Sequence, residues 1–143
     1  MREIFHLLYT SRSLEKVTSN HLQSILTSAR AHNLADELTG FLIVRNRFFL
    51  QILEGEEAKV RACFERIRND PRHSDILVHV EVESAARLTP SWSMGYVPWN
   101  DQMATSKSLI EIFENAERGV VQEKMDSLIT MLQSFAKEAR NVA

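Results

Sequence analysis

The stretch Thr39–Gly55, TGFLIVRNRFFLQILEG, decides the fold of this chain. Two apolar runs of strand-forming residues, 41–44 and 48–53, flank the polar Arg45-Asn46-Arg47, and asparagine tolerates the positive φ of a tight turn. This pattern predicts a β-hairpin. Both faces of each strand are apolar, which is typical of strands covered on both sides. We therefore expect the hairpin at the centre of a sheet.

One residue interrupts the apolar pattern of the hairpin. Gln51 lies within FFLQILEG, so its amide enters apolar surroundings. Leaving a buried amide unpaired would cost about 1–3 kcal/mol. We therefore expect a polar partner for Gln51.

The chain on either side of the hairpin predicts strands and amphipathic helices. Residues 4–9 alternate weakly as a first strand, with a loop over 10–19. A capping box at Asn20-x-x-Gln23 predicts a first helix over 20–31, ending at His32-Asn33. After an exit turn at Glu54-Gly55, a second helix and two strands follow, marked by the helical stripe Val60, Cys63, Phe64 and Ile67 before Pro71, and by the runs 76–82 and 92–99.

This order, β-α-β-β-α-β-β, predicts an α+β, ferredoxin-like sheet. Right-handed crossovers place the first two helices on one face of the sheet. Two C-terminal amphipathic helices would cover the other face or form a dimer seam, through Leu109, Ile110, Ile112 and Phe113 and then Val121, Met125, Leu128, Leu132 and Phe135. We expect a domain over residues 1–100 and a helical extension over 101–143 packed on it.

Composition excludes several classes of function. The 143 residues carry a formal net charge of -2 without blocks of Lys or Arg, which argues against nucleic acid and membrane partners. No apolar run approaches the ~20 residues of a membrane span, so we expect a cytoplasmic protein. The four glycines form neither a dinucleotide fingerprint nor a P-loop, and the five histidines lack metal-ligand spacing with one another or with Cys63. We expect no metal.

Three polar residues occupy otherwise apolar places: Tyr9 ends the first strand, Asn33 follows the first helix, and Gln51 lies in the third strand. The first and third strands are central neighbours in a ferredoxin-like sheet, so Tyr9 and Gln51 can meet on the helix-covered face. One interpretation is that the tyrosine only satisfies a buried amide. The other is a planar polar ligand between the sheet and the helices.

Short motifs spread along the chain resemble the BLUF family of flavin-binding blue-light sensors. The similarity runs from about residue 3 to 97 and rests on Tyr9-x-Ser11, Arg30-x-x-Asn33, Thr39-Gly40, Phe49-Leu50-Gln51-Ile52-Leu53-Glu54-Gly55, Asp70-Pro71-Arg72-His73 and Trp92-Ser93-Met94. Glu37-Leu38 departs from a commoner Gly-Ile, and His32 stands where many members have asparagine.

The resemblance implies an FAD cofactor held by its ring between the first two helices. It implies Ile25 and Ile67 on the two ring faces and Asn33 and Gln51 at its polar edge. Arg66, Asp70 and His32 would lie near its outer side, and Arg30 would contact phosphate. Without the resemblance, Arg66 and Asp70 would be interpreted as an i, i+4 surface pair.

The resemblance also implies photochemistry. Tyr9 would give an electron and a proton to the excited flavin through Gln51, whose amide would then exchange its donor and acceptor edges. Trp92 and Met94, with the same parity on an edge strand, would transmit the change to the C-terminal helices. Their alternative role is packing of that strand.

The sequence thus predicts a non-enzymatic blue-light photoreceptor that signals through an unidentified downstream protein or a homo-oligomer. Two rivals stay open: a ferredoxin-like module that binds a non-flavin ligand, and a flavoprotein of dark redox chemistry.

Overall fold

The computed structural model describes residues 3–97, 99, 101, 103 and 107–119. Its elements follow one another as β1 (Ile4–Ser13), α1 (Ser19–Ala35), β2 (Thr39–Arg45), β3 (Phe48–Gly55), α2 (Glu57–Arg68), β4 (His73–Ser84), β5 (Gly95–Val97) and α4 (Lys107–Arg118). The predicted helix through Val121 and Phe135 lies outside the described residues.

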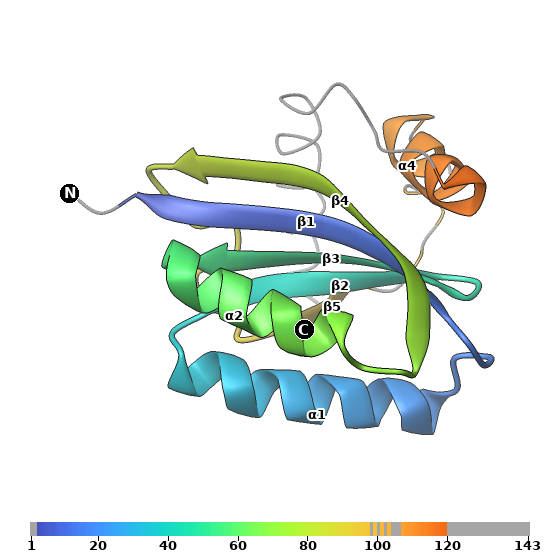
Figure 1. Ribbon diagram of the computed structural model, residues 1–143, viewed down its shortest axis with the longest axis horizontal. Coiled ribbons are helices and arrows are strands. Elements are labelled where there is room, and N and C mark those ends of the chain that lie inside the picture. The colour runs from blue at the N-terminus through green and yellow to red at the C-terminus, as the bar shows by residue number, and fades with distance from the viewer. Residues whose placement is uncertain (1–2, 98, 100, 102, 104–106, 120–143) are drawn as a thin grey trace.

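The strands form one five-stranded sheet in the order β4-β1-β3-β2-β5 (Figure 1). β1 is antiparallel to both β3 and β4, while β5 is parallel to β2. The predicted hairpin is β2–β3, and its turn contains Asn46 at φ 57°. All eight residues of β3 are buried. The ferredoxin-like α+β architecture and the central position of the hairpin are therefore confirmed.

Two apolar layers cover the sheet, one on each face. Leu7, Leu42 and Leu53 pack with α1 and α2 on the first face. Leu8, Ile43 and other alternate strand residues pack on the second face with α4, which contributes Leu109, Ile112, Phe113 and Ala116. In Figure 1, α1 and α2 lie together on one side of the sheet and α4 lies apart from them. Alternation along the strands thus separates the face under α1 and α2 from the face under α4.

The first strand is longer than its sequence pattern predicts. The sequence predicts a loop at residues 10–13, yet Thr10, Ser11 and Arg12 pair with β3 opposite Leu50, Phe49 and Phe48. Pairing with a central strand satisfies their backbone groups, which overrides the polar character of the segment. β3 likewise continues through the predicted exit turn at its end, and β4 exceeds the predicted 76–82 at both ends.

The first helix also differs at its two ends. Its N-cap is Thr18, whose hydroxyl accepts the backbone N–H of His21 at 3.1 Å, so the predicted capping box at Asn20 is wrong. The helix runs on to Ala35. Asn33 is therefore a buried residue of its last turn and does not follow the helix.

The predicted fifth strand over 92–99 is mostly wrong, because β5 contains only Gly95–Val97. Trp92 and Met94 lie in the preceding connection, and their backbone carbonyls accept hydrogen bonds from Gly40 N (3.1 Å) and Arg30 Nε (2.9 Å). These bonds replace a strand ladder there. A Cβ at Gly40 would lie 2.0 Å from Ile52 O, so only glycine allows this approach of β2 to β3.

One buried polar pair lies away from the helices α1 and α2. The Nε2 atom of His79, on β4, lies 2.7 Å from the hydroxyl of Thr10, on β1. Burial lowers the pKa of His79 to about 4. His79 is therefore uncharged at neutral pH.

Candidate functional site

A cavity of about 210 Å³ lies between the sheet and the helices α1 and α2. Its apolar lining includes Ile25 of α1, Ile67 of α2 and Leu42 of β2. Its polar lining includes Asn33 and Gln51. Such a cavity offers apolar walls and a few fixed hydrogen-bonding groups, which is how proteins hold small molecules.

Tyr9 and Gln51 meet in this cavity, as the sequence predicts. They are directly opposite each other on β1 and β3, and the Tyr9 hydroxyl donates a hydrogen bond to Gln51 Oε1. Both side chains are buried, and the Tyr9 ring packs against Phe64 with centroids 5.2 Å apart. Burial, with smaller contributions from Cys63 and Asp70, raises the pKa of Tyr9 above that of a free phenol. The phenol therefore keeps its proton unless it also loses an electron.

Both amides of the cavity are bonded to one connection, the residues between β4 and β5. Gln51 Nε2 donates to Met94 Sδ at 3.4 Å, and Asn33 Nδ2 donates to the carbonyl of Ser93 at 2.7 Å. The Cys63 thiol donates to Asn33 Oδ1 at 3.7 Å, and burial raises the pKa of this thiol. Each amide nitrogen carries a second hydrogen for a ligand.

Most of the predicted cofactor-binding residues line the cavity. They are Ile25, His32, Asn33, Gln51, Arg66, Ile67 and Asp70, and Tyr9 joins them. Arg30 is not among the lining residues; its Nε atom donates to the backbone of Met94.

Trp92 and Met94 lie on opposite faces of the sheet, so the prediction that they share one parity is wrong. Met94 packs in the apolar layer under α1 and α2. The Trp92 ring packs in the other layer, perpendicular to Phe41 at a centroid distance of 6.5 Å. A Cβ at Gly95 would lie 2.1 Å from this indole, so the glycine makes room for it.

The interpretation of Arg66 and Asp70 as a pair with each other is wrong. Arg66 Nη2 lies 3.7 Å from Asp36 Oδ2, between α2 and the end of α1. Asp70 accepts both Nε and Nη2 of Arg72, at 3.0 and 2.6 Å, and this guanidinium lowers the pKa of Asp70. Each residue is thus held at the cavity by a different partner.

Several lining residues are not among the predicted site residues, although some of them belong to the family motifs or to the helical stripe of α2. They are Ser11, His21, Ser28, Ala29, Leu42, Phe49, Cys63, Arg72 and His73. Ser11 shares the strand parity of Tyr9, and Ser28 and Ala29 follow Ile25 at helical spacing. Strand and helix periodicity could therefore have predicted these three residues. Periodicity does not predict His73, because its Nδ1 contact with Ser11 at 3.0 Å joins two strands across 62 positions of the sequence.

Two further findings concern other classes of protein. No group of three or more His, Cys, Asp or Glu residues in the described ranges is arranged to hold a metal ion. Among the helices that the structure describes, none is long and apolar enough to cross a membrane.

The chain belongs to the BLUF family, "Sensors of blue-light using FAD", whose model matches residues 4–95. The matched region contains both amides, the Tyr9–Gln51 pair and both cavity helices. The lining residues alone do not identify the ligand, and the family identifies it as a flavin.

Curated relatives place the same region in larger proteins. The chain is 33% identical over 89 residues to the photoactivated adenylate cyclase subunit beta of Euglena gracilis, covering 62% of this chain and 10% of that protein. It is 30% identical over 71 residues to the blue light- and temperature-regulated antirepressor BluF of Escherichia coli, covering 50% of this chain and 18% of that protein. The chain thus spans about a tenth to a fifth of these relatives.

Solved structures show the same architecture. The dark-state structure of BlrB, a BLUF protein, is similar with a TM-score of 0.72 and 26% identity over 94% of this chain and 98% of that one. The photo-activated state of BlsA gives a TM-score of 0.69 and 28% identity over 85% and 98% of the two chains.

Proposed function

We propose that this protein senses blue light with an FAD bound in the cavity, and that Tyr9 and Gln51 carry the response. The observation that supports this most is the bonded series from the Tyr9 hydroxyl to Gln51 Oε1 and from Gln51 Nε2 to Met94 Sδ. A single amide joins a phenol, the cavity and a flexible side chain.

The lining residues fit a flavin ring. Ile25 and Ile67 supply apolar surface from two helices, while Asn33 and Gln51 supply amide donors and acceptors for the carbonyl and imide groups of the ring. Arg66 is 47% exposed, which suits a contact near the solvent-facing side of a ligand. With His32 and Asp70, these residues would hold the cofactor.

When bound, flavin supplies blue-light absorption and, in its excited state, a strong one-electron oxidant. Tyr9 is the electron and proton donor in our proposal. Its buried phenol would release both together, because the isolated phenolate is disfavoured there. The proton leaves along the existing hydrogen bond to Gln51 Oε1 and returns to the phenol when the charges recombine.

Gln51 is the switch in this proposal. Rotation or tautomerisation exchanges which edge of its amide donates and which accepts, so the hydrogen bonds around the cavity differ after illumination. Met94 Sδ is a weak acceptor in a flexible side chain and can follow this exchange. A small red shift of flavin absorption would report the new hydrogen bonds.

We further propose that output goes through contact with another protein or through a change of homo-oligomeric state, without catalysis by these residues. Trp92, two residues before Met94, packs in the same apolar layer as α4, so a movement of this connection reaches the second face. A signal requires the two photostates to differ in how favourably that layer packs.

An absorption spectrum before and after blue light tests the proposed function. We expect a yellow protein that releases FAD on denaturation and shifts reversibly to the red. A colourless protein that takes up no flavin on reconstitution would point to a non-flavin ligand. A flavin bleached by a nicotinamide donor in the dark would point to redox chemistry.

A further inference from the structure

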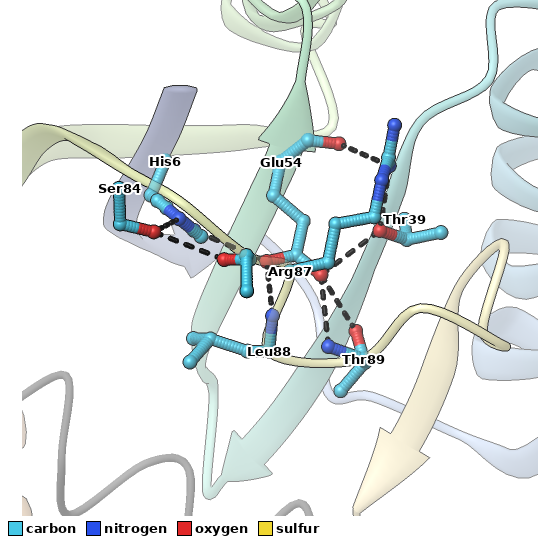
Figure 2. Close-up of polar contacts among 8 residues, drawn as sticks. His6, Thr39, Glu54, Ser84, Arg87, Leu88 and Thr89 are labelled. Atoms are coloured by element: carbon cyan, nitrogen blue, oxygen red, sulfur yellow. Dashed lines mark hydrogen bonds and ion pairs between the residues drawn. The ribbon is translucent and has the colours of Figure 1, made fainter. Parts of the chain in front are cut away.

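Glu54, near the end of β3, is a fully buried carboxylate outside the cavity lining. Figure 2 shows it at the centre of a polar cluster from β1, β2 and the connection after β4. Its oxygens accept the backbone N–H groups of Leu88 and Thr89 at 2.8 and 2.9 Å and the hydroxyls of Thr39 and Thr89 at 2.9 and 3.2 Å. The carboxylate is thus bound mainly by the connection between β4 and β5.

The surroundings of Glu54 favour its charged form. Burial alone would raise its pKa, but His6, the N–H groups of Leu88 and Thr89 and the Thr39 hydroxyl together lower it. His6 Nδ1 lies 3.1 Å from Glu54 Oε2. Arg87 adds a second link, because its Nη1 donates to the Glu54 backbone carbonyl at 3.2 Å. A carboxylate only accepts hydrogen bonds, which is what this set of donors requires.

A series of hydrogen bonds connects this cluster to the cavity. The Thr89 carbonyl accepts Trp92 N at 3.1 Å, and the Trp92 carbonyl accepts Gly40 N at 3.1 Å. The next two carbonyls, of Ser93 and Met94, are bound by α1 through Asn33 and Arg30. Residues 88–94 are therefore held at one end by Glu54 and at the other by residues around the cavity.

We propose that Glu54 is a positioning residue for the light response: it anchors residues 88–94, holds Met94 against Gln51 and so sets the lifetime of the lit state. This rests on the proposed function. Return to the dark state requires the Gln51 amide, next to Met94, to exchange its donor and acceptor edges again. This exchange is slow while Met94 is held firmly and becomes faster when Met94 is loosened. Glu54 acts through Met94 and makes no contact with the cavity.

Glu54→Gln is the sharpest test, because it keeps the shape and replaces one acceptor with a donor that faces other donors. Glu57→Gln is the matched control, since Glu57 is an exposed residue of α2 paired with Arg61 at 2.8 Å. We expect normal flavin content and red shift in Glu54→Gln, with dark recovery faster by about threefold or more. Glu57→Gln should recover as the unmodified protein does.

The combination with Met94→Ala separates positioning from general weakening of the fold. If Glu54 acts through Met94, Glu54→Gln should have little effect on recovery in a Met94→Ala background. An equal effect in both backgrounds, or unchanged recovery in a well-folded Glu54→Gln protein, would overturn the proposal. Should Glu54→Gln fail to fold, Thr89→Val removes one donor to the carboxylate and takes its place in the same comparison.

Hydrogen exchange in the dark gives a readout that does not depend on photochemistry. Residues 88–94 should exchange faster in Glu54→Gln than in Glu57→Gln, and equal exchange would refute the anchoring. If the unmodified protein itself shows no red shift, the proposed function is refuted. The exchange comparison then still decides whether Glu54 anchors the connection.

Discussion

Asn33→Ala removes the amide that binds both the cavity and the connection ahead of β5. Asn33 is 1% exposed, and its Nδ2 atom donates to Ser93 O at 2.7 Å. Alanine leaves that carbonyl and the Cys63 thiol without this partner. We expect the substitution to weaken both the fold and the grip on flavin.

The magnitude follows from the groups that lose their partner, the half-buried Ser93 carbonyl and the buried Cys63 thiol. Together their loss costs about 1–3 kcal/mol of unfolding free energy. For a chain of this size, that lowers the Tm by roughly 3–10 °C. Loss of a hydrogen bond of similar strength between Asn33 and the flavin ring would weaken flavin binding by about 5- to 150-fold.

Urea unfolding of the flavin-free protein and a flavin titration measure the two effects separately. Asn20→Ala is the matched control, because Asn20 is an exposed residue near the start of the same helix and does not cap it. It should leave both quantities nearly unchanged, since alanine is a better helix former than asparagine.

Equal stability of Asn33→Ala and Asn20→Ala would refute the role of Asn33 in holding the connection. If Asn33→Ala loses stability as expected but binds flavin with unchanged affinity, Asn33 holds the connection and does not contact the ring.

Three other predictions concern the light response and pH. Tyr9→Phe and Gln51→Leu should each retain flavin and lose the red shift; a normal light-minus-dark spectrum in either variant would contradict the relay. Met94→Ala should keep the red shift and reduce the light-induced change in hydrogen exchange over residues 107–118; exchange that is equal in dark and light in the unmodified protein would show that the signal leaves by another surface. His79 has a pKa lowered from 6.5 to about 4, so the unfolded chain binds the extra proton between these values and stability falls as pH drops from 6.5 towards 4. We expect a loss of about 2 kcal/mol after allowing for solvent screening, and His79→Gln should flatten it in unfolding titrations.

The central part of the site was predictable from local patterns. The hairpin and the strand order place Tyr9 beside Gln51, because a ferredoxin-like sheet makes the first and third strands neighbours. Helical spacing likewise directs Ile25 and Ile67 to the face that packs on the sheet. The flavin itself came from the family motifs, since an apolar cavity with two amides fits many planar ligands.

Other parts of the site depend on contacts between distant segments. Arg66 and Asp70 have the spacing of a helical pair, yet each finds a closer partner, Asp36 and Arg72. Long charged side chains can reach several partners, and local spacing does not choose among them. The sequence pattern places Glu54 in a turn, because its hydrogen-bond donors come from residues at least 15 positions away in the chain.

The sequence by itself determined the order of strands and helices, the apolar faces and the polar residues set among them, because these follow from periodicity of 2 or 3.6 residues along the chain. Only the tertiary structure decided that Met94 turns toward Gln51 and Trp92 toward the opposite face. The physical reason is that their connection has no repeating backbone geometry. Its carbonyls are bound one by one by Gly40, Asn33 and Arg30, and the direction of each side chain follows from those separate bonds.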